Sequence, residues 1–136
     1  MLRDSGLSKA EREMIVVAVA GANDCLYCFV AHGAILRVYA KNALVADQVG
    51  VNYLKADITP RQRAMLAFAL KVAERSGEIV DDDYAALRAH GFDDDDIWDI
   101  GNISAFFALS NRMANPIALR PNDEFHPLGR LPREKR

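Results

Sequence analysis

The pattern of hydrophobic and polar positions begins with a charged turn that leads into an unbroken apolar stretch. Ser8 and Glu11 fit an S-x-x-E capping box, in which each side chain accepts a hydrogen bond from a free backbone N–H at a helix start. The pattern predicts a helix over residues 8–22. Its second half, residues 14–22, has no charged side chain, so we expect it to be buried on every side. Glu13 is the last charge before this stretch.

Three further helices are predicted in the middle of the chain. Asp24 is a candidate N-cap for a helix over residues 25–39, and residues 41–53 show a weaker helical periodicity. Thr59 and Gln62 fit a T-x-x-Q capping box, with a proline at the first helical position between them. Apolar residues at helical spacing follow this box and predict a fourth helix.

The remaining chain continues the helical pattern and then loses it. The fourth helix is expected to end at residues 76–77, and helices near 83–90 and over 93–113 follow. The core positions predicted for the last helix are Ile97, Ile100, Ile103 and Phe107. Prolines interrupt residues 122–136, which we expect to form an extended arm. Because no strand periodicity and no repeat occur, the sequence predicts an all-α fold of about six helices, one domain over residues 1–136.

Composition narrows the class of protein. The chain has 136 residues, of which 51% are hydrophobic, enough to fill the core of one domain. A net charge of −2 provides no cationic excess for phosphate backbones, so we expect no nucleic-acid partner. The longest apolar run, residues 14–20, is far shorter than the about 20 residues of a membrane span. The first residues lack the apolar stretch of a signal peptide, which favours a cytoplasmic location.

Negative charge is concentrated in residues 78–99, which carry a net charge of −8. The aspartate runs at 81–83 and 93–96 could bind a cation or a basic partner. Both runs lie where helices are expected to begin, and carboxylates there stabilise the positive end of the helix dipole and cap free N–H groups. We therefore interpret both runs as helix starts.

The candidate chemistry lies at the start of the second predicted helix. Cys25, Cys28 and His32 follow the pattern CxxCxxxH, which places their side chains on one helical face. In the first turn, free N–H groups favour an anion, so we expect the pKa of the Cys25 thiol to be lowered. His32 is one turn after Cys28, within reach for proton exchange, and Glu13 of the preceding helix could orient and charge the imidazole.

A dithiol in such surroundings can reduce a peroxide. One thiolate attacks and becomes a sulfenic acid, and the second thiol then closes a disulfide. Two other interpretations stay open. The cysteines could be buried small side chains without a chemical role. Cys25, Cys28, His32 and Glu13 could also form a mixed zinc site, although no second ligand pair of the kind typical of structural zinc follows in the chain.

The spacing Glu13-x11-Cys25-x2-Cys28-x3-His32 resembles the active-site pattern of the alkylhydroperoxidase D (AhpD-like) group in the carboxymuconolactone decarboxylase superfamily. Similarity to its peroxidase-related subfamily extends over nearly the whole chain. The segments that carry this similarity are residues 7–15, 59–66, 96–100, 110–114 and 120–124.

This resemblance implies an AhpD-like helical fold that assembles as a homo-oligomer, such as a dimer, trimer or hexamer. It implies reduction of organic hydroperoxides or hydrogen peroxide. Cys28 would form the sulfenic acid, Cys25 would resolve it as the disulfide, and Glu13 with His32 would form the proton relay. We expect no bound cofactor and no metal, because an external thiol reductant would restore the dithiol.

The sequence departs from the family pattern at two points. The best-studied members have a second histidine between the cysteines, where this chain has Tyr27, a candidate accessory residue that implies a shorter proton path or a weaker activity. Relatives also tend to carry an additional N-terminal helical segment, so we expect a short form or a fragment. Two other functions stay open: a lyase or hydrolase resembling carboxymuconolactone decarboxylase, which works without a thiol pair, and a redox sensor whose disulfide changes its assembly.

Overall fold

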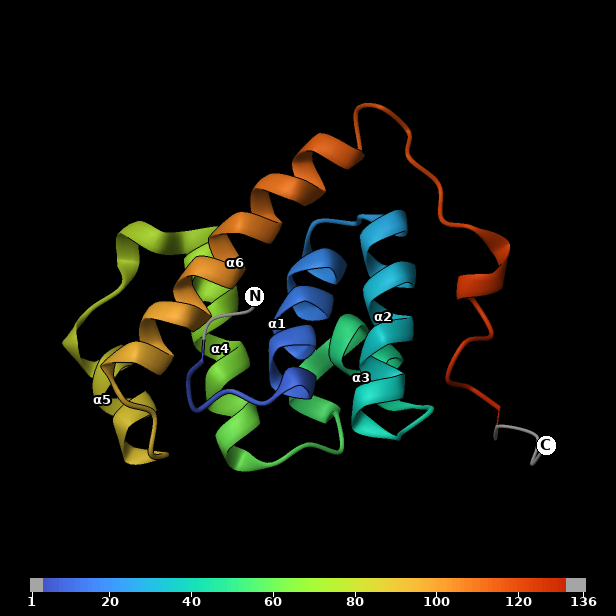
Figure 1. Cartoon of the computed structure of the whole chain (residues 1–136). Coiled ribbons are helices and arrows are strands. Elements are labelled where there is room, and N and C mark those ends of the chain that lie inside the picture. The colour runs from blue at the N-terminus through green and yellow to red at the C-terminus, as the bar shows by residue number, and fades with distance from the viewer. Residues whose placement is uncertain (1–3, 132–136) are drawn as a thin grey trace.

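The computed structural model describes residues 4–131 and is built from helices (Figure 1). The α-helices are α1 (Lys9–Ala22), α2 (Leu26–Ala40), α3 (Val45–Asn52), α4 (Pro60–Arg75), α5 (Asp81–Ala89) and α6 (Asp94–Ala114). Short 3-10 turns occupy Tyr53–Lys55, Ser76–Glu78 and Asp123–Phe125. Residues 4–131 contain no strand, so the predicted all-α fold is confirmed. No helix in this range combines the length and apolarity needed to cross a membrane.

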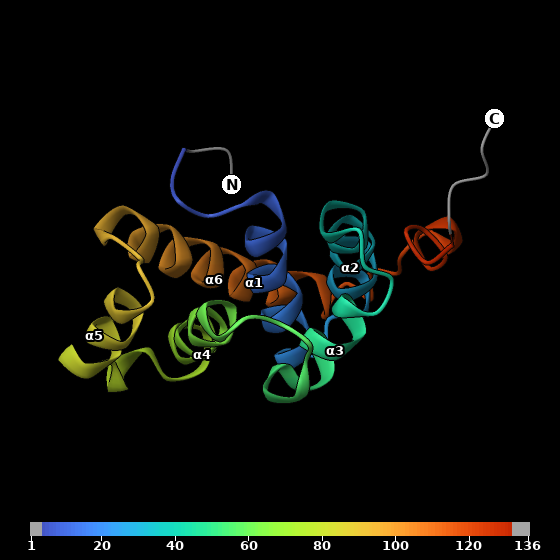
Figure 2. The same cartoon turned by 90° about the horizontal axis from the view of Figure 1, so that it is seen from below.

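Helix α1 forms the centre of the core. It lies between α4 and α6 on one side and α2 and α3 on the other, and it contacts all four (Figure 2). Every residue from Glu11 to Ala20 is buried, whereas Gly21 is half-buried and Ala22 is exposed. The predicted burial on every side therefore holds as far as Ala20. The predicted core positions of α6 are buried as well: Ile97, Ile100, Ile103 and Phe107.

Helix starts follow the predicted capping pattern, with one exception at α2. The capping boxes of Ser8 and Thr59 form as predicted, and Asp93 forms another at α6. Asp24 is not the N-cap of α2: its φ of 52° is left-handed, and Cys25 caps the helix instead. The chain reverses between α1 and α2 within three residues, and aspartate is one of the few residue types that tolerate the left-handed conformation this turn requires.

Two helix starts differ from the predicted ones by two residues or more. Helix α3 begins at Val45 rather than at residue 41, because Lys41 itself ends α2 in the left-handed conformation. Helix α5 begins at Asp81 rather than at residue 83, because the whole aspartate run lies in its first turn. The acidic runs are helix starts, as the sequence indicated.

The described part of the tail lies along α2, where an extended arm was expected (Figure 1). The guanidinium of Arg37, a buried residue of α2, donates hydrogen bonds to three tail carbonyls, those of Phe125, His126 and Leu128. Arg130 forms a bidentate ion pair with Asp47 of α3. Residues 122–131 are thus attached to α2 and α3, and residues 132–136 lie outside the described residues.

Candidate active site

The first pair of candidate residues, Glu13 and His32, forms a contact between α1 and α2. Glu13 lies where the charged turn of α1 joins its apolar half, and His32 lies in the middle of α2. The distance from His32 Nδ1 to Glu13 Oε2 is 2.7 Å. The carboxylate is buried, whereas 23% of the histidine side chain is exposed. A carboxylate accepts the hydrogen bond of Nδ1–H, which fixes the tautomer and leaves Nε2 for proton exchange.

A third helix, α6, contacts the His32 imidazole on a different side from Glu13. The ring of Phe107 on α6 meets the His32 ring edge-on, with centroids 5.0 Å apart and an interplanar angle of 75°. The sequence indicated Phe107 only as a core position. Because α1, α2 and α6 each contribute one of these three side chains, the orientation of His32 depends on the packing of the bundle.

The two cysteines form a disulfide at the start of α2, with Cα atoms 5.3 Å apart. Cys25 Sγ also accepts a hydrogen bond from the backbone N–H of Cys28 at 3.3 Å, so a sulfur takes the place of the usual capping oxygen. Both residues are buried, with 1% and 4% of their surface exposed. They pack against Ala20 of α1 and Ala114 of α6.

The candidate residues lie in two pairs rather than in one cluster. Glu13 contacts His32, and Cys25 is bonded to Cys28. Within the described residues no hydrogen bond joins His32 to a sulfur atom, and one turn of α2 separates Cys28 from His32. Tyr27 is half-buried and packs against the cysteine cluster. Any proton transfer between the pairs must therefore cross this turn along one face of α2.

The mixed zinc site is not formed. Among residues 4–131, no group of three or more histidine, cysteine, aspartate or glutamate side chains is arranged to hold a metal ion. The disulfide engages both sulfurs that such a site would need.

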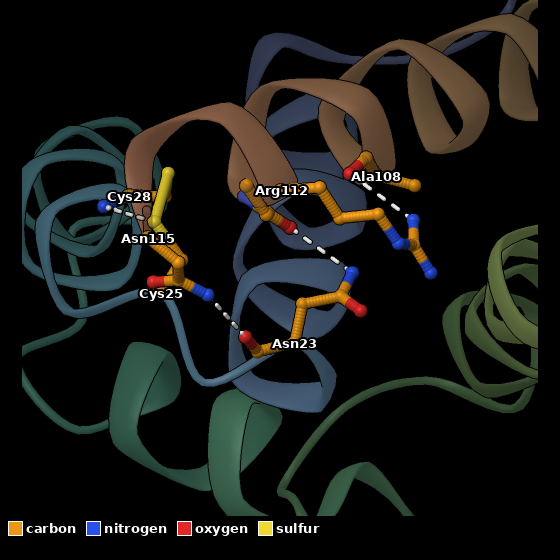
Figure 3. Close-up of a disulfide and its surroundings, with 7 residues drawn as sticks. Asn23, Cys25, Cys28, Ala108, Arg112 and Asn115 are labelled. Carbon is orange, nitrogen blue, oxygen red and sulfur yellow. Dashed lines mark hydrogen bonds between the residues drawn. A yellow bond between two sulfur atoms is a disulfide. The ribbon is translucent and has the colours of Figure 1, made fainter. Parts of the chain in front are cut away.

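Two asparagines, Asn111 in α6 and Asn115 directly after this helix, hold the turn that carries the cysteines through hydrogen bonds (Figure 3). Asn115 Nδ2 donates a hydrogen bond to the Asn23 carbonyl at 2.9 Å, and Asn23 Nδ2 donates one to Asn111 Oδ1 at 3.3 Å. Asn111 is fully buried. No local pattern predicts these hydrogen bonds, because their partners are 88 and 92 positions apart in the sequence. Their only signal was the similarity of residues 110–114 to the family.

A cleft of about 470 Å³ opens beside Cys25, between the end of α1, the start of α2 and α3. Its apolar lining includes the side chains of Leu26, Phe29 and Val51. Gly21 and Gly50 also line the cleft, and they are so close that a Cβ on Gly21 would overlap the backbone of Gly50. Cys28 does not line the cleft, so the two sulfurs have different surroundings.

Comparison with known proteins identifies the family. The sequence pattern of the carboxymuconolactone decarboxylase family matches residues 1–47, which include all four candidate residues. The crystal structure of an alkylhydroperoxidase AhpD core, an uncharacterized peroxidase-related protein from Ralstonia eutropha JMP134, has 68% sequence identity and a TM-score of 0.96. The match covers 98% of this chain and 70% of that one. The chain belongs to the AhpD-like carboxymuconolactone decarboxylase superfamily.

Other AhpD-like structures agree with this result. An uncharacterized peroxidase-related protein from Silicibacter sp. TM1040 has 47% identity and a TM-score of 0.92, over 96% of this chain and 68% of its own. A protein of unknown function from Agrobacterium tumefaciens, named as a candidate AhpD antioxidant defence protein, shares the fold at 24% identity. Its TM-score is 0.76, over 87% of this chain and 82% of its own. No curated protein sequence matches the chain. The AhpD-like family and fold inferred from the sequence are confirmed.

Proposed function

We propose that this AhpD-like chain is a thiol-dependent peroxidase that reduces organic hydroperoxides or hydrogen peroxide. One observation carries the proposal. The Cys25–Cys28 disulfide lies at the start of the helix that, one turn later, presents a histidine bonded to a buried carboxylate. A CxxC pair supplies two electrons, and the imidazole supplies the proton that the departing oxygen needs.

The cycle begins with the reduced dithiol. The Cys28 thiolate attacks the terminal peroxide oxygen, the O–O bond breaks, and Cys28 becomes a sulfenic acid. The departing alkoxide or hydroxide takes a proton from His32 Nε2 and leaves as alcohol or water. The Cys25 thiol then attacks the Cys28 sulfur, and the sulfenic oxygen leaves as water while the S–S bond forms. The oxidised form corresponds to the disulfide of the present structure.

Re-reduction requires an external dithiol, since the chain has only these two cysteines. In the proposed cycle the reductant approaches Cys25 from the cleft, which Cys25 lines and Cys28 does not, and the cleft must open further because only 1% of Cys25 is exposed. Attack there forms a mixed disulfide with the reductant and releases Cys28 as the thiolate that starts the next cycle. The apolar lining suits a reductant with a hydrocarbon part.

Glu13 acts through His32. Its ionised carboxylate holds the Nδ1–H and stabilises the positive charge that the ring carries while protonated. Contact with the Phe107 ring restricts the rotation of the imidazole, so Nε2 keeps one direction. The proton is therefore held one helical turn from Cys28.

The proposal is tested by following peroxide consumption with a small-molecule dithiol as reductant. Cys28→Ser and the double variant Cys25→Ser, Cys28→Ser should be inactive. Cys25→Ser should accumulate a sulfenic acid on Cys28 that a sulfenic-acid-specific reagent traps. His32→Gln should lower the rate by about 10²–10⁴-fold, the usual contribution of a general acid or base.

Other outcomes would favour the other functions that the sequence left open. Full turnover of a lactone by the double cysteine variant would favour a lyase or hydrolase. A change of oligomer size on oxidation, without peroxide turnover, would favour a redox sensor. Either result would contradict the peroxidase.

A further inference from the structure

One buried side chain near the cysteines has an amide group that is only half used. Asn111 of α6 is fully buried, and its Oδ1 accepts a hydrogen bond from Asn23 Nδ2 at 3.3 Å. Its own Nδ2 is buried as well, and no group of residues 4–131 accepts a hydrogen bond from it. A buried donor without an acceptor destabilises the fold, so an acceptor that forms in another state of the protein would account for it.

Asn111 lies between the parts of α6 that contact the two candidate pairs. Phe107 contacts the His32 ring, and Ala114 packs in the cluster of the two cysteines. Asn111 is four residues after Phe107 and three before Ala114, so the three side chains share one face of α6. On α2, one turn separates Cys28 from His32. The unpaired amide is therefore placed between the residue that contacts the histidine and the residue that contacts the sulfurs.

Reduction of the disulfide creates a new acceptor beside this face. Cys28 is 4% exposed and packs with Ala20 and Ala114, and such apolar surroundings disfavour a thiolate. The backbone N–H of Cys28 donates to Cys25 Sγ, so at the helix start it stabilises the other sulfur. An ionised acceptor forms shorter and stronger hydrogen bonds than a neutral one. The Cys28 thiolate is thus the acceptor that a buried amide donor would favour most.

We infer that Asn111 Nδ2 donates a hydrogen bond to the Cys28 thiolate in the reduced protein. The inference rests on the proposed function and extends it, because it assigns a residue to the sulfur that attacks the peroxide. An amide does not titrate, so it stabilises the thiolate without giving up its proton, and His32 remains the group that protonates the departing oxygen. The hydrogen bond between Asn23 and Asn111 Oδ1 holds the amide in one orientation.

The charged and titratable groups around Cys28 leave one other candidate donor. Glu13 and His32 are bonded to each other, and Asp24, in the turn before the cysteines, is exposed. The Arg112 guanidinium donates to the Ala108 carbonyl at 3.1 Å, and Figure 3 shows it directed away from the disulfide. Tyr27 packs against the cysteine cluster, so its hydroxyl is the alternative that the experiment must separate from Asn111.

Thiolate absorbance followed against pH in the Cys25→Ser chain tests the inference, because Cys28 is then the only thiol. Adding Asn111→Leu, which keeps the shape but removes both polar atoms, should lower the thiolate fraction at neutral pH by about tenfold, the effect of one hydrogen bond to a charged group. Asn23→Ala is the matched control: it removes the hydrogen bond to Asn111 Oδ1, keeps Nδ2, and should leave the titration unchanged. Tyr27→Phe should also leave it unchanged. Circular dichroism checks that each variant is folded.

NMR of the Cys25→Ser chain with Asn111 intact gives a test that needs no change in α6. The side-chain amide protons of Asn111 should shift as Cys28 titrates, and they should stay constant over the same pH range in the wild-type disulfide. Equal effects of Asn111→Leu and Asn23→Ala, a larger effect of Tyr27→Phe, or amide signals that do not follow the thiol would each overturn the inference. Neither measurement uses a peroxide, so a failure of the peroxidase proposal is distinguishable from a failure of this one.

Discussion

The two halves of α1 are equally buried but differ in what they contact. Glu11, Arg12 and Glu13 are each at most 7% exposed, yet each is charged and each pairs with a different helix. Their partners on α4, α6 and α2 are Arg61, Asp99 and His32. From Met14 to Ala20 the side chains of the same helix are apolar and pack in the hydrophobic core.

The two halves of α1 therefore have different roles. The apolar half supplies burial, which stabilises any arrangement that removes its surface from water. The charged half determines how the neighbouring helices are placed, because each ion pair forms only when one particular helix packs against α1 in one register. The residue at the junction, Glu13, belongs to the charged half and carries the candidate chemistry. The comparison predicts large stability effects from the apolar half, and specific effects on activity or local structure from the charged half.

The largest effect is expected in the apolar half. Ile15 has no exposed surface, and Ile15→Ala should lower the free energy of unfolding by about 2–5 kcal/mol, through lost burial and the cavity it leaves. Urea denaturation measures this loss. Val51→Ala, at a highly exposed position, should change stability by less than about 0.5 kcal/mol. Equal losses in the two variants would contradict the assignment of Ile15 to the central core.

In the charged half, Glu13→Gln should affect activity more than stability. Glutamine keeps the size of the side chain and an oxygen for the Nδ1–H, but it cannot stabilise a charged imidazole. We expect the peroxidase rate to fall by about 10²-fold, at the lower end of general acid–base contributions. The neighbouring Glu11→Gln is the control, because Glu11 pairs with Arg61 away from His32 and should leave the rate unchanged. An unchanged rate profile against pH in Glu13→Gln would leave Glu13 with a structural role only.

The segment that leads into α1 is expected to show a smaller effect on stability. Asp96 is buried and accepts hydrogen bonds from the backbone N–H of Gly6 at 2.6 Å and of Asp93 at 3.0 Å. Asp96→Ala should cost about 1–3 kcal/mol, because both N–H groups lose a charged acceptor. Asp94→Ala removes an exposed carboxylate paired with Arg88 and should cost less than about 1 kcal/mol. Thermal unfolding of the two variants should rank them in this order.

The smallest effect is expected at the tail and depends on pH. The hydrogen bond from Arg130 lowers the pKa of Asp47, so this ion pair stabilises the folded state above the unfolded pKa of about 4 and is lost as the pH falls through the folded pKa. At neutral pH Asp47→Asn should cost less than about 1 kcal/mol, because the pair is exposed to solvent. The difference from the wild type should shrink below pH 4 in urea titrations. A difference independent of pH would show that Asp47 contributes through packing.

Much of the fold could be predicted from sequence because its signals are local. Capping boxes such as that of Ser8 and the spacing of Ile97, Ile100 and Phe107 depend on residues within a few turns. The turn before α2 was predicted less well. Asp24 has the side chain of an N-cap, but the tight reversal of the chain moves that position to Cys25.

The parts that sequence did not reveal depend on distant partners. Asn23 could not be linked to Asn111 and Asn115, because short amide side chains give no periodic signal and their partner lies in the last helix. Burial of Arg12 was equally hidden, because charge argues for exposure unless the partner is known.

Through Arg37, the path of the tail affects helix α2. This guanidinium belongs to the same helix as His32, five residues further on, and its three carbonyl acceptors all come from residues 125–128. Mutations in residues 125–128 therefore affect Arg37 only if they move the main-chain carbonyls, and the side chains there are comparatively free to vary. Relatives could diverge in this segment while keeping its path, and a loss of that path would affect the helix that carries the candidate residue His32.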